Sequence, residues 1–201
     1  PTRLLNFPIT KPLIGNEEIE AVTSVLRSGW VTQGPKVEEF EFKFSELVGS
    51  KYSVAVSSCT AALHLALRVI GISTNDEVIV PSLSFIASAN AIRYCGAIPH
   101  FVDIERNSFN IDPDQVLSEI NKKTKAILCV HQMGMPCNIN KLLQISKEYS
   151  IPLIEDAACA LGSRVLINNK WEHIGKPRGK MAAFSFHPRK VITTGDGGML
   201  T

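Results

Sequence analysis

The sequence lacks the marks of a metalloprotein, a disulfide-rich protein or a nucleic-acid-binding protein. Its five cysteines are scattered, and no two of them form a CxxC pair. An odd number of scattered cysteines favours reduced thiols, so we expect a cytoplasmic protein without a metal site. The formal net charge is only +2, with no basic stripe, so binding to nucleic acid has no electrostatic support.

Long apolar runs are also missing. The most apolar stretch, residues 78–92, is interrupted by Pro81 and several serines and falls short of the ~20 residues that a membrane span needs. The N-terminal segment PTRLLNFPIT has no apolar core of the kind found in signal peptides. Internal repeats and low-complexity segments are absent, so we expect neither a repeat protein nor a membrane protein.

What the sequence does contain is an ordinary globular composition, with 45% hydrophobic and 20% charged residues. Short β-rich runs alternate with segments that have apolar residues at helical spacing. The expected strands are 53–56, 77–80, 98–102, 126–130, 153–155 and 182–186, and the expected helices between them are 61–70, 86–94, 113–121 and 139–149. This alternation predicts an α/β fold with a mostly parallel sheet flanked by helices in three layers.

The two ends of the chain differ from its middle. Residues 1–50 predict a helical segment, with helices near 17–27 and 36–47, and residues 51–201 predict the sheet domain. The last residues, GDGGMLT, read as a turn that leads into a strand, and no helix follows to cover the sheet. We therefore expect the sequence to be part of a longer protein.

The segment SSCTAALHLAL, residues 57–67, places small hydroxylated residues between a strand and an apolar helix. Such a turn directs free backbone N–H groups and the positive end of the helix to one point, which suits a phosphate group. Thr60 offers a hydroxyl as well. Taken alone, the segment is more often explained by Ser58 or Thr60 acting only as a helix cap.

The segment PLIEDAACALG, residues 152–162, brings Glu155 and Asp156 to the end of a buried strand, where ligands bind in open α/β sheets. A carboxylate at this position could cap a following helix, hold a metal ion or pair with a protonated ring nitrogen. A metal ion is the least favoured of the three, because neither a histidine nor a second acidic cluster flanks the pair.

The segment MAAFSFHPRKVITTGDGGML, residues 181–200, leads from a strand through Ser185 and His187 to Lys190. Most lysines are simply solvated, but this one is preceded by apolar residues and followed by glycines that allow the backbone to approach a ligand closely. A partly desolvated lysine can act as an amine nucleophile.

The three segments together match the needs of pyridoxal 5′-phosphate. A helix start anchors the phosphate, Asp156 keeps the pyridine nitrogen protonated, and Lys190 holds the aldehyde carbon as a Schiff base. Phe85, in the segment PSLSF, offers an aromatic face on which the ring can stack.

Taken with the segments SGWVTQGPKVEEFE, VIVPSLSFIASANAIRYCGAIPHFVDI and EDAACALGS, the chain resembles the DegT/DnrJ/EryC1/StrS family of pyridoxal-phosphate-dependent nucleotide-sugar aminotransferases. The blocks occur in the family's order and spacing over almost the whole length. The resemblance implies the large domain of fold type I transferases, a homodimer with active sites at the subunit interface, and a C-terminal small domain that these 201 residues do not include.

The resemblance also implies individual roles. Lys190 is similar to the Schiff-base lysine, Asp156 to the partner of the ring nitrogen and Phe85 to the stacking aromatic residue. The phosphate ligands correspond to the backbone at Cys59 together with Thr60 and Ser185. Two residues depart from the pattern: Cys59 replaces a common glycine, and Cys159 stands near the cofactor where glutamine or histidine is common.

The expected function is transfer of an amino group from glutamate to a nucleotide-linked keto-deoxy sugar, for surface polysaccharide, including lipopolysaccharide, or for antibiotic sugars. Residues 1–201 alone are expected to be inactive. The alternatives are a homologue that binds the cofactor without turnover, a dehydratase-type homologue, which the presence of Lys190 disfavours, and a nucleotide-binding domain, which the lack of a GxGxxG motif disfavours.

Overall fold

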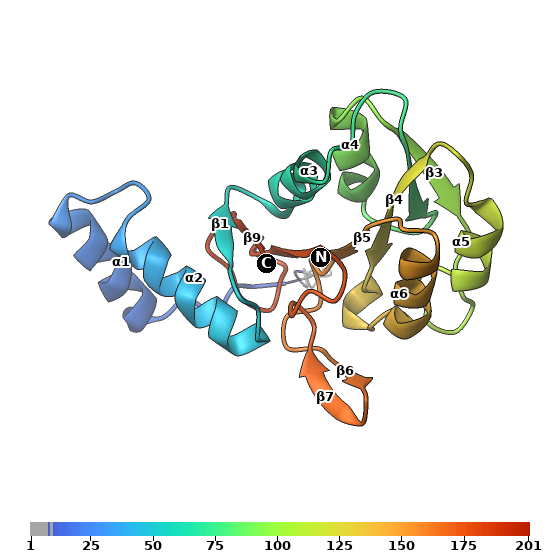
Figure 1. Cartoon of the computed structure of the whole chain (residues 1–201). Helices are drawn as coiled ribbons and strands as arrows, with labels where there is room; N and C mark the ends of the chain where they lie inside the picture. The colour runs from blue at the N-terminus through green and yellow to red at the C-terminus, as the bar shows by residue number, and fades with distance from the viewer. Residues whose placement is uncertain (1–7, 9) are drawn as a thin grey trace, which may run out of the picture.

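The fold is described from a computed structural model, which covers residue 8 and residues 10–201 (Figure 1). The N-terminal segment for which no signal peptide is expected lies almost entirely outside these residues. Helices and strands alternate along the chain, as the sequence predicts. The architecture is α/β, with one seven-stranded sheet and a separate two-stranded hairpin.

The elements follow one another in this order: α1 (Asn16–Ser28), α2 (Pro35–Val48), β1 (Val54–Val56), α3 (Cys59–Val69), β2 (Glu77–Pro81), α4 (Ile86–Tyr94), β3 (Ile98–Val102), α5 (Pro113–Glu119), β4 (Thr124–Val130), the 3₁₀ turn η1 (Gln132–Gly134), α6 (Ile139–Glu148), β5 (Leu153–Asp156), β6 (Arg164–Ile167), β7 (Lys170–His173), β8 (Met181–Ser185) and β9 (Gly198–Leu200). Side-chain caps begin three of the helices, and those of α5 and α6 were expected from the sequence. Asp112 accepts from the N–H of Asp114 at the start of α5, and Asn138 accepts from the N–H of Lys141 at the start of α6.

The large sheet has the strand order β1-β9-β8-β5-β4-β2-β3. Its neighbours pair in parallel from β3 to β8, whereas β9 pairs antiparallel with both β8 and β1. Since both neighbours of β9 run opposite to it, β1 has the same direction as β8. Six strands therefore end at one edge of the sheet, which is where open α/β sheets bind their ligands.

Alternating side chains of the strands supply a core on each face of the sheet. Val78 and Val80 of β2 pack with residues of α3 and α4, whereas Ile79 between them packs with residues of α5 and α6. Figure 1 shows these two helix pairs on opposite sides of the strands. The mostly parallel sheet with helices on both faces confirms the predicted fold class.

The first two helices differ in how firmly they are held. Phe44 of α2 packs edge-on against Phe184 of β8, with ring centroids 5.0 Å apart, and belongs to a third apolar cluster. In contrast, α1 contains no buried residue. Both helices end at glycines in the left-handed conformation, Gly29 and Gly49, where residues with a Cβ would be strained.

The predicted strands and helices are all present, with ends that differ by a few residues. The hairpin formed by β6 and β7 was not expected from the sequence. The turn-and-strand interpretation of the last residues is confirmed by β9. Among residue 8 and residues 10–201, no helix combines the length and the apolar composition of a membrane span.

Candidate cofactor site

The buried carboxylate of Asp156 lies at the end of β5, at the ligand-binding edge of the sheet. Ser88 of α4 donates a hydrogen bond to Oδ2 over 2.8 Å, and the N–H of Ala158 donates to Oδ1 over 3.1 Å. Burial raises the pKa of Asp156, while these two donors and the positive charge of Lys190 oppose that rise. The site thus surrounds one buried acid with groups that favour its ionised form.

Helix α3 begins beside this acid. Ser58 is its N-cap, accepting from the N–H of Ala61 over 3.1 Å. In the part of the chain that the structure describes, the N–H groups of Cys59 and Thr60 make no hydrogen bond, so both can serve a ligand. Burial raises the pKa of the Cys59 thiol; the charge of Asp156 adds to this effect, and the charge of Lys190 opposes it.

Gly198 of β9 brings Ser185 close to the start of α3. A Cβ atom on Gly198 would lie 2.5 Å from the carbonyl carbon of Ser58 and 2.7 Å from the nitrogen of Cys59. Ser185 at the end of β8 is the direct partner of Gly198 in the sheet. The half-buried hydroxyl of Ser185 and the free N–H groups of α3 therefore lie on adjoining segments, and only a glycine permits this approach.

Lys190 lies in an irregular turn after β8, where its N–H donates to the carbonyl of His187. Its half-buried side chain places Nζ 3.0 Å from Sγ of Cys159. Phe85 precedes α4, and its side chain is 78% exposed, so one face of the ring is open to a ligand. Ser88, one turn later on the same helix, contacts Asp156.

The second acid of β5 lies in a polar network that the sequence did not reveal. Glu155 is fully buried and accepts hydrogen bonds from the N–H groups of Arg178 and Gly179. Its Oε2 atom is 3.1 Å from Nε2 of His131, and Nδ1 of that ring accepts the N–H of Cys137. Because Nδ1 is an acceptor, the ring proton lies on Nε2 and is donated to Glu155.

Burial would raise the pKa of Glu155, but the donors from His131 and from the two backbone N–H groups hold it below its ordinary value. Burial opposes a charge on the His131 ring, whereas Glu155 and Cys137 raise the pKa of the ring. Because Nδ1 accepts the N–H of Cys137, this nitrogen carries no proton, and the ring is neutral. The network joins the end of β4, the end of β5 and the loop before β8.

Two alternatives from the sequence can now be compared with the structure. Asp156 does not cap a helix, because turns and then β6 follow β5. A histidine does reach Glu155, but it comes from a distant part of the chain. Among residue 8 and residues 10–201, no group of three His, Cys, Asp or Glu side chains is arranged to hold a metal ion.

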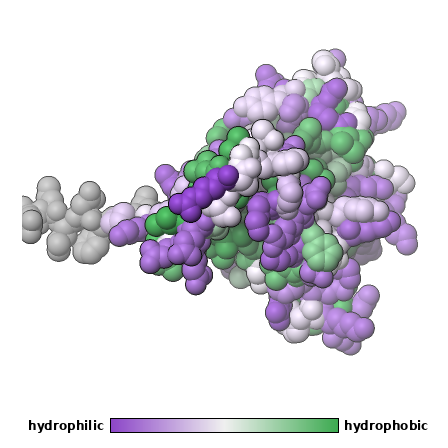
Figure 2. Space-filling model, turned by 90° about the vertical axis from the view of Figure 1, so that its left-hand side faces the viewer, coloured by the Kyte–Doolittle hydropathy of each residue, from purple (hydrophilic) through white to green (hydrophobic). Residues whose placement is uncertain are grey.

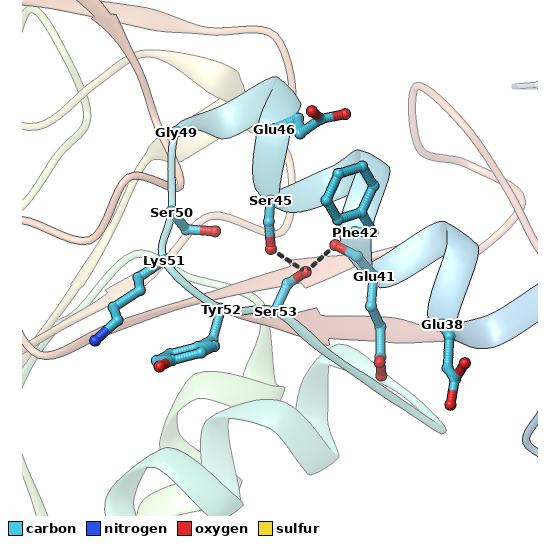
Figure 3. Close-up of a pocket in the computed structure, with 10 residues that line it drawn as sticks. All are labelled: Glu38, Glu41, Phe42, Ser45, Glu46, Gly49, Ser50, Lys51, Tyr52 and Ser53. Atoms are coloured by element: carbon cyan, nitrogen blue, oxygen red, sulfur yellow. Dashed lines mark hydrogen bonds between the residues drawn. The ribbon is translucent and has the colours of Figure 1, made fainter.

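A shallow hollow elsewhere on the surface belongs to α2 and the segment after it (Figure 3). Its lining residues are Glu38, Glu41, Phe42, Ser45, Glu46, Gly49, Ser50, Lys51, Tyr52 and Ser53. Ser53 links Ser45 to the backbone carbonyl of Glu41, and the Glu41 carboxylate accepts the N–H of Ala55. These contacts brace the connection from α2 to β1, and none of the residues expected to bind the cofactor lines this hollow.

The mostly parallel sheet with helices on both faces is the architecture of the large domain of pyridoxal-phosphate-dependent transferases of fold type I. A model of the DegT/DnrJ/EryC1/StrS aminotransferase family matches residues 12–201. The chain belongs to this family. The prediction made from the sequence blocks is thereby confirmed, and so is pyridoxal 5′-phosphate as the cofactor at the level of the family.

Individual relatives are consistent with this family assignment. The spore coat polysaccharide biosynthesis protein SpsC of Bacillus subtilis is 45% identical over 195 residues, which are 97% of this chain and 49% of SpsC. The PLP-form structure of Spr1654 from Streptococcus pneumoniae has a TM-score of 0.91 and 36% identity, over 98% of this chain and 53% of the other. The structure of DesI in the presence of its TDP-sugar product has a TM-score of 0.82 and 34% identity, over 91% of this chain and 45% of DesI. The chain spans about half the length of these relatives.

Proposed function

We propose that this chain holds pyridoxal 5′-phosphate for the transfer of an amino group to a nucleotide-linked keto-deoxy sugar, with glutamate as the amino donor. The observation that carries the proposal is the grouping of Asp156, Lys190 and the open start of α3 at one edge of the sheet. In this assignment Lys190 forms the covalent bond to the cofactor and Asp156 faces the pyridine nitrogen. Phe85 stacks on the ring, and Cys159 lies beside the lysine.

The residues at the start of α3 fit a phosphate group. The unengaged N–H groups of Cys59 and Thr60 can donate to its oxygens, and the hydroxyls of Thr60 and Ser185 can add two more donors. The positive end of α3 favours the negative charge. The close approach at Gly198 supports this assignment, because it holds Ser185 near the helix start without a side chain in between.

Bound pyridoxal phosphate supplies an electron sink that delocalises negative charge from the substrate carbon. The protein's part is to keep that sink effective and to move protons. The ionised Asp156 holds a proton on the ring nitrogen, and the amine of Lys190, once free, takes a proton from the substrate carbon and returns one. The turn at residues 187–190 positions this amine.

Names of relatives support the substrate class. SpsC is named for spore coat polysaccharide biosynthesis, and DesI was solved with a TDP-sugar product. We therefore place the reaction in the formation of amino sugars for surface polysaccharides, lipopolysaccharide among them. The proposal includes a cytoplasmic location, which is supported by the five cysteines, all of them free thiols.

The proposal also includes a homodimer that completes the site. Apolar side chains of α1, Ile19, Val22 and Leu26, are each more than half exposed. Figure 2 looks onto the side of the molecule where α1 and α2 lie and shows apolar side chains on that surface. A second copy could cover these side chains. Because the chain spans half of its relatives, we propose that residues 1–201 form the cofactor-holding part and do not transaminate alone.

Reductive labelling tests the proposal directly. The complete protein is incubated with pyridoxal phosphate, reduced with borohydride and digested for peptide mapping. The pyridoxyl group should be found on Lys190, and it should be lost in Lys190→Ala but kept in Lys180→Ala, which changes an exposed lysine just before β8. A label on another lysine would overturn the assignment, and an assay with glutamate and nucleotide-linked keto sugars then tests the substrate class.

A further inference from the structure

We infer that Ser88 is a positioning residue for the proposed reaction, which fixes the orientation and the ionised state of the Asp156 carboxylate. The inference rests on the proposed function and adds a residue that does not touch the cofactor. Its basis is a chain of three polar groups. Ser84 Oγ lies 2.7 Å from Ser88 Oγ, which donates over 2.8 Å to Oδ2 of Asp156.

Ser88 is unusual because it is a fully buried hydroxyl on the apolar face of α4, beside Ala89, Ala91 and Ile92. A buried hydroxyl without a partner costs free energy, so its place in this core requires an acceptor. Asp156 is that acceptor, 68 residues away in the sequence. The contact links α4 to the end of β5, which are two separate elements of the site.

The direction of the hydrogen bonds depends on whether Asp156 is ionised. An ionised carboxylate has no proton to donate, so the Ser88 hydroxyl must point to Oδ2, and its oxygen is then free to accept from Ser84. Ser84 is half-buried, so the chain of hydrogen bonds runs from a partly exposed hydroxyl to a buried acid. Each donor along it favours the ionised form.

Other groups also face Asp156. Lys190 acts on Asp156 from the turn after β8, and the Cys59 thiol does so from the start of α3, whereas Cys129 of β4 lies on the Glu155 face of the sheet. His131 lies behind the strand as a neutral ring, and Glu155 is held on the opposite face. Of these groups only Lys190 carries a positive charge, and in the proposed reaction its amine is engaged with the cofactor for part of each cycle. Ser88 is the side-chain donor that stays on Asp156 throughout.

The same helical turn carries Phe85. The carbonyl of Phe85 accepts the N–H of Ser88 over 3.1 Å, so the proposed stacking residue and the partner of Asp156 are joined by backbone. A displacement of Ser88 would therefore disturb two proposed contacts with the cofactor ring: the stacking of Phe85 and the approach of Asp156 to the ring nitrogen. A serine that only filled space in the core would have neither effect.

The test uses the complete protein in four forms: wild type, Ser88→Ala, Ser88→Thr and Ser146→Ala. Ser146 is a matched control, because its half-buried hydroxyl also donates a short hydrogen bond, but on α6 at the other face of the sheet. The first readout needs no cofactor. Carboxyl ¹³C resonances of aspartate are followed against pH in the cofactor-free protein, with Asp156 assigned by its loss in Asp156→Asn.

Asp156 should titrate at higher pH in Ser88→Ala than in wild type, and Ser88→Thr should return it toward the wild-type value. With cofactor bound, Ser88→Ala should shift the pH dependence of the cofactor absorbance and slow the glutamate half-reaction by about tenfold, the loss expected for one hydrogen bond to a charged group. Ser146→Ala should match wild type in both readouts.

An unchanged Asp156 titration in Ser88→Ala, or an equal change in Ser146→Ala, would overturn the inference. If Ser88→Ala does not fold, Ser84→Ala replaces it and must shift the titration in the same direction by a smaller amount; no shift overturns the inference. Failure of the proposed function looks different, because the wild-type protein would then carry no borohydride label on Lys190.

Discussion

Glu155 and Asp156 are consecutive residues of β5 whose carboxylates point to opposite faces of the sheet and meet opposite conditions. Glu155 accepts three hydrogen bonds and has a lowered pKa. Asp156 is equally buried, has two donors, and has a raised pKa. The first acid therefore stabilises the fold as an anion, whereas burial makes the charge of the second unfavourable in the cofactor-free fold.

The first prediction concerns Asp156→Asn. A raised pKa means that Asp156 contributes stability that is fully present below its unfolded value of 3.8 and is lost as pH rises through the folded value. Asparagine carries no charge, accepts from Ala158 and can donate to Ser88. At neutral pH the cofactor-free variant should thus be about 1 kcal/mol more stable than wild type, and the difference should shrink in acid. Urea unfolding at several pH values measures it.

The same variant should lose most of its amino-transfer activity, because an amide cannot hold the proton on the ring nitrogen. Stopped-flow measurement of the glutamate half-reaction gives the loss. A variant that is destabilised at neutral pH, or that transfers amino groups at the wild-type rate, would contradict the role given to this carboxylate.

The second prediction concerns Glu155, whose contribution to stability depends on pH in the opposite direction. Its lowered pKa contributes stability that is present above its unfolded value of 4.5 and lost as pH falls through the folded value. Glu155→Ala removes the acceptor of three buried donors and should destabilise the protein by about 3–5 kcal/mol. Denaturant unfolding at neutral pH provides the measurement.

Glu155→Gln is the matched variant for this effect. Its carbonyl can still accept from the N–H groups of Arg178 and Gly179, but its amide meets the Nε2–H of His131, so one contact is lost. The variant should be less destabilised than Glu155→Ala and should unfold with a weaker dependence on acid than wild type. If the stability of Glu155→Gln fell in acid as much as that of wild type, Glu155 would not be the group responsible for the loss of stability in acid.

The sequence was sufficient to predict the alternation of strands and helices and the edge at which Asp156 lies. Short apolar runs such as residues 126–130 and 153–155 have a pattern that local sequence determines. The partners of Glu155 and Asp156 were not predictable in this way, since His131 and Ser88 are 24 and 68 residues from them. The one local indication of the Asp156 partner was a single serine on the apolar face of the helix at 86–94. A serine there indicates that a hydrogen-bond acceptor is needed, but the local sequence does not identify that acceptor.

The third prediction concerns Cys159, the one exposed thiol of the five. Iodoacetamide should alkylate Cys159 first in the folded, cofactor-free protein, since the other thiols are buried. Because Sγ is 3.0 Å from Nζ of Lys190, bound pyridoxal phosphate should slow the reaction severalfold. Peptide mass mapping over time measures both effects. Equal labelling with and without cofactor would place Cys159 outside the site.

The last prediction concerns Gly198, which is required by space and not by backbone conformation. Its φ lies outside the left-handed region, but a Cβ would lie 2.5–2.7 Å from backbone atoms of Ser58 and Cys59. Backbone cannot move aside as a flexible side chain can, so Gly198→Ala should push β9 away from the start of α3.

The displacement would separate Ser185 from the N–H groups of Cys59 and Thr60, and we expect cofactor affinity to fall at least tenfold while the sheet remains folded. Equilibrium dialysis against pyridoxal phosphate measures the affinity, and circular dichroism verifies the fold. Gly15→Ala is the control, because its added Cβ, at the start of α1, would meet only the carboxylate end of the flexible Glu18 side chain. Wild-type affinity in Gly198→Ala would show that the phosphate is not held between α3 and β8, whereas a loss confined to this variant would support the site as assigned.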